Sequence, residues 1–286
     1  MGDICGSMCF SYAINFSAQS LQSKLHLGAG DLLDQNNPYA NITFLDGNSW
    51  HERIPRPGYF FSGFDQPQLP VLVMLDPPGE IALNSQSANP SEQTQASISL
   101  KSMQWGLIPR WVKSAEKATE LFVYGLNARG ETVEEKPMFR EAWKDSVCLI
   151  PASGFFEWKE VNKKKYPYYI QMKDDSVMLM AGICSEWIHP ETGEWQQTFA
   201  ILTTEANALM QEIHNVKKRM PVIFDGPSGS CFLRASMAQR KTMLKPCDND
   251  VLKAHQVGDW LNNSRGLRNM EGAILEVKKD FPQSLF

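Results

Sequence analysis

The sequence predicts an α+β fold: a single domain with a mainly antiparallel, barrel-like β-sheet and a few peripheral helices. Three observations favour this fold class. Short β-branched and aromatic runs alternate with turn-forming residues, which is typical of antiparallel strands joined by hairpins. Segments with helical periodicity are few. The 286 residues show no internal repeat and no clear linker, and a chain of this length buries a sizeable core.

The composition limits the possible classes of function. A net charge of -4 argues against a generally basic nucleic-acid-binding surface, so any DNA contact must come from a local patch. The six cysteines form no CxxC pair and no histidine lies at metal-ligand spacing, which indicates reduced thiols, no metal and no organic cofactor. No apolar stretch approaches the roughly 20 residues that span a bilayer. We therefore expect a cytoplasmic protein with no membrane partner, and a monomer because no heptad stripe is present.

The first third of the chain mixes one helix with loops and short strands. Leucines at helical intervals predict a helix over Ser17–Leu33. The Pro- and Gly-rich stretch Tyr39–Phe61 predicts loop and short strand, and Val71–Leu75 predicts a buried strand between prolines. Asn84–Ser97 is polar and lacks aromatic residues, so we expect an exposed loop there.

The remainder predicts strands interrupted by short helices. A hairpin turn is expected at Lys163–Lys165, and a polar loop at Gly258–Gly266. Thr203 or Thr204 is the expected cap of a helix that follows. The expected helices are Phe139–Trp143, Ala206–Ile213 and Ser230–Leu244, and the expected strands are Tyr166–Met172, Val177–Trp187, Thr198–Thr204, the apolar run after Met220-Pro221, Val251–Val257 and Ala273–Val277.

The stretch Cys148–Lys159, C-L-I-P-A-S-G-F-F-E-W-K, carries the first candidate catalytic group. Glu157 follows an apolar run and lies between Phe156 and Trp158 in the sequence. Burial among aromatic rings raises the pKa of a carboxyl and makes it a proton donor and acceptor near neutral pH. The alternative is that Glu157 closes a strand and faces water, since glutamate is rarely buried without a partner.

Two further segments carry candidate substrate contacts. In Met103–Trp111, turn residues including Pro109 hold Trp105 and a second tryptophan, and such rings can stack on unpaired bases; core packing is the alternative. In the polar cluster after Leu126, Asn127 can orient a substrate, and Arg129 can bind a phosphate through two hydrogen bonds. The alternative for these two residues is a solvated loop.

A titratable ring lies beside a basic run later in the chain. His214 follows the expected helix at Ala206–Ile213, and the basic run Lys217-Lys218-Arg219 begins three positions later. Histidine changes charge near physiological pH, and clustered cations attract phosphates. A purely structural histidine is the alternative.

The N-terminal segment divides into a leader and a domain. Residues 1–7 are small and polar, unlike the rest, and we interpret them as a leader or tag remnant that precedes a domain over residues 8–286. If the working chain begins at Cys9, its α-amine and thiol form a 1,2-aminothiol. The alternative for Cys9 is a small buried hydrophobic residue.

Five motifs, in this order, resemble the SRAP family, the SOS-response-associated peptidases: M-C-F-S, W-G-L-I-P-x-W, N-A-R-x-E-T, G-F-F-E-W-K and H…R-M-P-V-I. The resemblance runs from Met8 to about Val277. It implies an SRAP-like fold and covalent capture of abasic sites in single-stranded DNA, through an N-terminal cysteine that forms a thiazolidine with the ring-opened sugar aldehyde. The protein would associate with the nucleoid when bound to damaged DNA.

The resemblance also implies roles for individual residues. Cys9 is the implied nucleophile with Asn127 beside it, and Glu157 and His214 are the implied acid and base. Bases are expected on Trp105 or Trp158, close to Pro109. The flanking phosphates are assigned to Arg129 and Arg219.

The chemistry of the residues agrees with this assignment. An α-amine with a pKa near 7.7–8.0 is substantially neutral in cells and attacks an aldehyde without a strong base. Loss of water then needs an acid, for which Glu157 is suited, and His214 can open the sugar or carry the same proton. Both groups of Cys9 remain in the ring product, so the protein is consumed.

Two features depart from the family pattern. Family members have the cysteine directly after the initiator methionine, whereas here Met1–Ser7 precede Met8. With these residues retained, the nitrogen of Cys9 is an amide and the ring cannot form, so the leader must be artificial, bypassed by initiation at Met8, or removed by the protein itself. The spacing from His214 to Arg219 is also wider than the H-x-R-M-P of the family.

Two other functions remain open at this point. The first is a thiol peptidase that acts on other proteins, with Cys9 as nucleophile, His214 as base and Asn127 as the orienting residue. The second is a reversible reader of modified bases, in which Trp105, Trp111 and Trp158 form an aromatic pocket.

Overall fold

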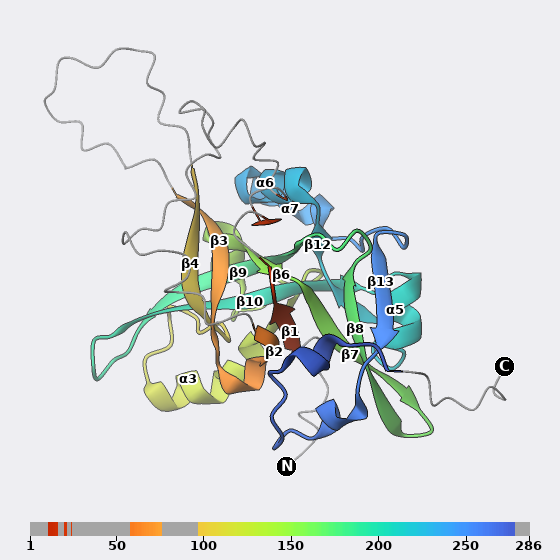
Figure 1. Cartoon of the computed structure of the whole chain (residues 1–286). Helices are drawn as coiled ribbons and strands as arrows, with labels where there is room; N and C mark the ends of the chain where they lie inside the picture. The colour runs from red at the N-terminus through yellow and green to blue at the C-terminus, as the bar shows by residue number, and fades with distance from the viewer. Residues whose placement is uncertain (1–10, 17–19, 22–23, 25–57, 76–96, 278–286) are drawn as a thin grey trace, which may run out of the picture.

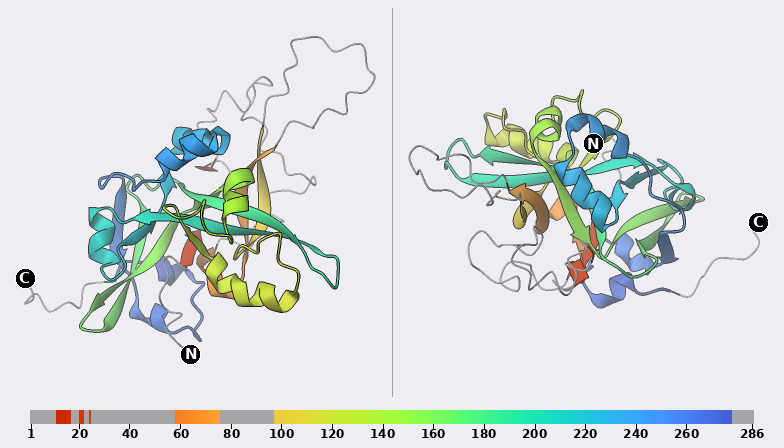
Figure 2. Two further views of the ribbon diagram at one scale, coloured as in Figure 1. Left: turned by 180° about the vertical axis from the view of Figure 1, so that it is seen from behind. Right: turned by 90° about the horizontal axis from the view of Figure 1, so that it is seen from above.

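The computed structural model describes residues 11–16, 20–21, 24, 58–75 and 97–277. Two β-sheets form the body of the molecule, and the helices lie on the outside of these sheets (Figures 1 and 2). None of the helices in the described ranges is long and apolar enough to cross a membrane. The predicted α+β domain with a barrel-like, mainly antiparallel sheet is confirmed.

The larger sheet closes on itself. Its strands run in the order β11-β10-β4-β3-β6-β9-β12, and β9 also pairs with β10, so five strands form a closed barrel. The barrel is mixed because β4 and β10 are parallel. The strands of this sheet are β3 (Gln68–Leu75), β4 (Ser97–Trp105), β5 (Asn127–Arg129), β6 (Val147–Ala152), β9 (Met178–Ile188), β10 (Trp195–Glu205), β11 (Arg219–Pro221) and β12 (Ile223–Phe224).

The smaller sheet has five antiparallel strands in the order β13-β8-β7-β1-β2. The turn from β7 to β8 has positive φ angles at both Asn162 and Lys163, the conformation that matches the twist of a two-residue hairpin. The predicted hairpin turn at Lys163–Lys165 is therefore confirmed, although the turn begins one residue earlier, at Asn162. The strands are β1 (Ser11–Ile14), β2 (Gly58–Ser62), β7 (Gly154–Val161), β8 (Lys164–Met172) and β13 (Leu252–Gln256).

The stretch Cys148–Lys159 belongs to both sheets. Its first half lies in β6 of the barrel and its second half in β7 of the smaller sheet, with Ser153 between them. The main-chain N–H of Ser153 donates to the carbonyl of Ala13, 2.8 Å away, which ties this junction to β1. A sequence run that reads as one strand therefore joins the barrel to the second sheet.

Aromatic residues fill the core where the two sheets meet. The ring of Trp105 is completely buried, 4.9 Å from that of Tyr12 and 6.2 Å from that of Phe199 between centroids. Its indole N–H donates to the carbonyl of Leu126 at 2.9 Å, so the buried polar group is satisfied.

The helices are short and begin at side-chain caps or tight turns. Asn207 caps α5, because its side chain accepts from the N–H of Met210, so the expected capping by Thr203 or Thr204 is wrong: both threonines lie within β10. The helices are α3 (Ala115–Phe122), α4 (Arg140–Asp145), α5 (Ala208–Ile213), α6 (Gly226–Arg234) and α7 (Met237–Met243), and the 3-10 turns are η1 (Gly63–Asp65), η2 (Val123–Gly125), η3 (Asp259–Asn262) and η4 (Glu271–Ile274).

Two other expected elements differ from the structure. The expected helix Ser230–Leu244 is two helices, because the chain is extended at Ala235 and Ser236 starts α7 with a capping box. The expected strand Ala273–Val277 is wrong: its first residues complete η4, and Val277 makes one main-chain hydrogen bond to Gln256.

Several expectations fall on the undescribed ranges. All of the expected helix Ser17–Leu33 except residues 20–21 and 24, and all of the expected loop Asn84–Ser97 except Ser97, which begins β4, lie outside the described residues. Only the end of Tyr39–Phe61 is described, as the start of β2.

Candidate active site

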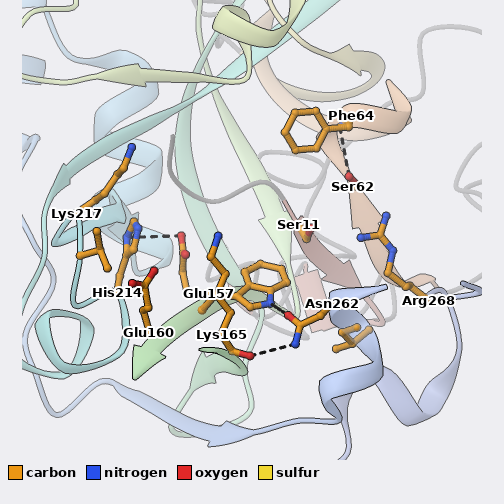
Figure 3. A pocket seen from close by; sticks show the side chains of 13 residues that line it. Ser11, Ser62, Phe64, Glu157, Glu160, Lys165, His214, Lys217, Asn262 and Arg268 are labelled. Carbon is orange, nitrogen blue, oxygen red and sulfur yellow. Dashed lines mark hydrogen bonds and ion pairs between the residues drawn. The ribbon is translucent and has the colours of Figure 1, made fainter. Parts of the chain in front are cut away.

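A pocket of about 300 Å³ opens on the smaller sheet (Figure 3). It collects side chains from both ends of the chain, since β1, β2, β7, β8, the segment after α5 and the segment after β13 all contribute. The lining residues are Ser11, Ser62, Phe64, Glu157, Trp158, Glu160, Lys165, His214, Val216, Lys217, Leu261, Asn262 and Arg268.

The carboxyl of Glu157 is buried at the inner end of this pocket. Side chains alternate along a strand, so Glu157 shares a face of β7 with Phe155, which packs in the barrel core. Only 5% of Glu157 is exposed, which excludes the alternative that it closes a strand and faces water. A buried carboxyl requires a polar partner, and one is supplied by His214.

His214 is placed by the end of α5. Its main-chain N–H donates to the carbonyl of Met210 at 2.8 Å, and its Nδ1 lies 3.0 Å from the carbonyl oxygen of Arg219. A carbonyl only accepts, so Nδ1 carries the hydrogen, and Nε2 is the nitrogen that takes up or releases a proton. The same Nδ1 lies 3.8 Å from Oε1 of Glu157 (Figure 3).

Asn215 fastens the segment that carries His214 to the strand that carries Glu157. Its Nδ2 donates to the carbonyl of Glu160 at 2.8 Å, and its Oδ1 accepts from the N–H of Glu160 at 3.0 Å. The side chain thus makes the two backbone hydrogen bonds that a neighbouring strand would make at this point of β7. The sequence analysis did not identify Asn215. Its position directly after His214 was a usable signal, because asparagine side chains readily form hydrogen bonds with the backbone.

Trp158 forms another wall of the pocket. Its ring is half-buried, and its N–H donates to Oδ1 of Asn262 at 2.7 Å. Nδ2 of Asn262 in turn donates to the carbonyl of Lys165 at 3.0 Å, so η3 is tied to the β7–β8 hairpin. The structure therefore brings three of the candidate residues, Glu157, His214 and Trp158, together in one pocket.

Asn127 and Arg129 lie on β5, outside the lining of this pocket. The strand runs parallel to β10, with Asn127 opposite Ile201 and Arg129 opposite Thr203. Asn127 is half-buried and Arg129 is exposed.

The guanidinium of Arg219 is engaged by protein groups. It forms a two-point ion pair with Glu131, and its Nη2 also donates to the carbonyl of Thr203 at 2.9 Å. The hydrogen bonds from Arg219 hold the pKa of the Glu131 carboxyl below its usual value. Arg219 thus connects β11 to the turn that follows β5, in a geometry that differs from the exposed phosphate contact expected for it.

The predicted contacts Trp105 and Pro109 are both buried. Trp105 is part of the core described above and presents no face to a base, so the alternative of core packing holds for it. Trp111 is 42% exposed, and its N–H donates to the carbonyl of Pro137 at 3.2 Å.

Cys9 lies outside the described residues, although Ser11, two positions later, begins β1 and lines the pocket. Within the described ranges, no group of three or more histidine, cysteine, aspartate or glutamate side chains gathers as a metal site.

Known proteins resemble this chain in sequence and in fold. The chain is 35% identical over 170 residues to the abasic site processing protein YoqW of Bacillus subtilis, covering 58% of this chain and 72% of that protein. It is 30% identical over 204 residues to the abasic site processing protein HMCES of Xenopus tropicalis, covering 63% of this chain and 59% of that protein.

A crystal structure of a protein from Bacteroides thetaiotaomicron superposes with a TM-score of 0.70 and 29% identity, covering 94% of this chain and all of that one. A protein from Bordetella bronchiseptica has the same fold, with a TM-score of 0.63 and 20% identity. The family model for SOS response associated peptidase (SRAP) matches residues 8–264. The chain therefore belongs to the SRAP family.

Proposed function

We propose that this protein captures abasic sites in single-stranded DNA as a thiazolidine formed on Cys9. One observation carries the proposal: the buried pair Glu157 and His214 faces a pocket whose wall includes Ser11. Ser11 follows Cys9 by two positions in the sequence, and two residues of extended chain span at most about 7 Å. Relatives named as abasic site processing proteins support the choice of substrate.

The proposed reaction proceeds in three steps from the ring-opened sugar. The neutral α-amine of Cys9 attacks the C1′ aldehyde and gives a carbinolamine. Glu157 protonates the hydroxyl group, water leaves, and an imine forms. The thiol of Cys9 then adds across the C=N bond, with sulfur on carbon and the proton on nitrogen, which closes the five-membered ring. His214 opens the sugar or carries the same proton at Nε2.

The remaining predicted residues are proposed to hold the strand. Arg129 is exposed and suits a backbone phosphate, and Asn127 on the same short strand is proposed to orient the sugar or the amine. A base is proposed to stack on Trp158 in the pocket wall. Arg219 would have to release Glu131 before it could bind a phosphate, so we assign it to holding β11 in place.

The reaction requires a free amine on Cys9, so we also propose that residues 1–8 are absent from the active form. Initiation at Met8 followed by methionine removal would achieve this. Self-removal is the alternative. The thiol of Cys9 attacks the carbonyl carbon of Met8, and the Met8–Cys9 peptide bond breaks to give a thioester and a free amine on Cys9. Water then hydrolyses the thioester and releases residues 1–8, with help from Glu157 and Asn127. The intact mass of a Glu157→Gln variant tests self-removal, which is rejected if the variant loses its leader as fast as the wild type.

The central experiment uses the chain expressed from Met8, with the amine of Cys9 confirmed free by mass spectrometry. It is incubated with a single-stranded oligonucleotide that carries one abasic site, and with the matching intact oligonucleotide. We expect a heat-stable shifted band on a denaturing gel with the abasic strand only, and its loss in Cys9→Ala, which should retain salt-sensitive binding. Absence of the band in the wild type would reject covalent capture and leave a peptidase or a reversible reader.

A further inference from the structure

The segment after β13 crosses the smaller sheet and completes the pocket. Polar residues dominate it, yet long-range hydrogen bonds fix its path. Oδ1 of Asn269 accepts from the main-chain N–H groups of Tyr59, at 2.7 Å, and Phe60, at 3.2 Å. Nε2 of His255 lies 2.8 Å from the carbonyl oxygen of Ile274. These contacts secure the segment to the edge strand β2 and to β13.

Arg268 is positioned by this arrangement. It directly precedes Asn269, and its guanidinium lies over the ring of Phe60, 4.6 Å from the centroid. Phe60 is itself buried and packs against Phe156 at 4.9 Å. Stacking covers one face of a guanidinium but leaves its N–H donors, which lie in the plane, available at the edge. The side chain is therefore oriented in advance for a planar acceptor or a phosphate.

Arg268 also differs from Arg219 in its charge environment. Arg219 is neutralised by Glu131, whereas no carboxylate of the described chain lies within ion-pair distance of Arg268. Arg268 lines the same pocket as Glu157 and His214 and lies on the side of the pocket opposite His214 (Figure 3). An unneutralised guanidinium in the wall of a pocket attracts an anion.

We infer that Arg268 binds a phosphate of the captured strand, next to the abasic sugar. This inference rests on the proposed function, because the anion is the backbone of the proposed substrate. The residue lies beyond residues 8–264, which the family model matches, and none of the family motifs contains it. The sugar would then lie between the acid–base pair on one side and the Arg268 contact on the other.

Reversible binding separates this role from the covalent step. The probe is a fluorescein-labelled single-stranded oligonucleotide with one tetrahydrofuran residue, an abasic analogue that lacks the aldehyde. Anisotropy titrations of the chain expressed from Met8 at several salt concentrations give the slope of log K against log salt. For single strands each phosphate contact contributes about 0.7 to this slope. We expect Arg268→Gln to bind about fivefold more weakly at low salt, with the slope reduced by about 0.7.

Two variants serve as controls. Arg268→Lys keeps the charge and should retain the wild-type slope. Arg265→Gln removes an exposed arginine from the same segment that does not line the pocket, and should leave the affinity unchanged. An unaltered slope in Arg268→Gln, or an equal loss in Arg265→Gln, overturns the inference. Failure of the proposed function is distinct, because it appears as the absence of the covalent band in the wild type.

Discussion

Nδ1 of His214 and Oε1 of Glu157 lie 3.8 Å apart, and both side chains are almost completely buried. His214 lies at the end of α5 and Glu157 lies in β7. Two hydrogen bonds from the side-chain amide of Asn215 to the backbone of β7 hold these elements together. Nδ1 donates its hydrogen to the carbonyl of Arg219, so the ring and the carboxyl act on each other through charge and not through a direct hydrogen bond. The pair therefore has the composition and the burial that acid–base chemistry requires.

Replacing Glu157 by glutamine should slow adduct formation about 100-fold at saturating DNA, because the amide keeps the shape of the carboxyl but cannot donate its proton. Reversible binding of the tetrahydrofuran oligonucleotide should not change. Single-turnover rates from denaturing gels measure the effect. Glu160→Gln, on the same strand and in the same pocket, is the control and should react at the normal rate. An unchanged rate in Glu157→Gln would remove Glu157 from the mechanism.

Asn215→Ala should slow the reaction through the position of His214. The change removes both hydrogen bonds to the backbone of Glu160, and we expect a loss of about 1–2 kcal/mol in the free energy of unfolding. Asn249→Ala is the matched control, since Asn249 Oδ1 accepts from the N–H of Ala208 at the other end of α5. Thermal unfolding should detect both changes, whereas only Asn215→Ala should reduce the adduct rate. Equal rates in the two variants would contradict a positioning role.

The two predicted DNA-contact tryptophans should behave differently. Trp105 is fully buried, so Trp105→Ala should destabilise the fold by about 3–5 kcal/mol, measured by denaturant unfolding. Trp158 is half-buried in the pocket wall, and Trp158→Ala should weaken binding of single-stranded DNA by about 1–3 kcal/mol, the range for one base stack. Normal DNA binding by Trp158→Ala would exclude stacking on this ring.

The ion pair of Glu131 with Arg219 should make stability depend on pH. The pKa of Glu131 is lower in the folded than in the unfolded protein, so its stabilising contribution is fully present above the ordinary pKa of glutamate. This contribution is lost as the pH falls through the lowered value. Glu131→Gln should therefore be less stable than wild type at neutral pH, by about 1 kcal/mol or less because the carboxylate is half-exposed, and the difference should shrink in acid.

Urea unfolding of wild type and Glu131→Gln between neutral and acidic pH measures this difference. Glu135→Gln, in the same exposed turn, is the control and should follow the wild type at every pH. A constant difference between wild type and Glu131→Gln would show that the pair contributes through packing alone.

Local patterns predict the fold class and most strands because they depend on neighbouring residues. The β7–β8 hairpin follows from its turn residues, and the burial of Glu157 follows from its aromatic neighbours. The wrongly predicted helix caps and helix ends each depend on a single side chain, such as Asn207 at the start of α5. The residue at which a helix begins or ends is decided by tertiary contacts as well as by the local sequence.

Long-range pairings in the site had no sequence signal. Glu131 and Arg219 are 88 residues apart, and each has several possible partners of opposite charge. The polar loop that contains Asn262 reads as solvated surface, yet Asn262 bonds to Trp158 across 104 positions. For Trp105, a turn motif suggested exposure, whereas closure of the barrel buries it.

Ser11 and Arg268 line one pocket although nearly the whole chain separates them. Contacts between such distant positions form late in folding, because the intervening chain must first be ordered. During synthesis the wall that contains Arg268 leaves the ribosome long after β1, which begins at Ser11. The nascent protein therefore carries β1 for most of this interval without a finished pocket, so the proposed capture of abasic sites should reach its full rate only when the segment that contains Arg268 docks.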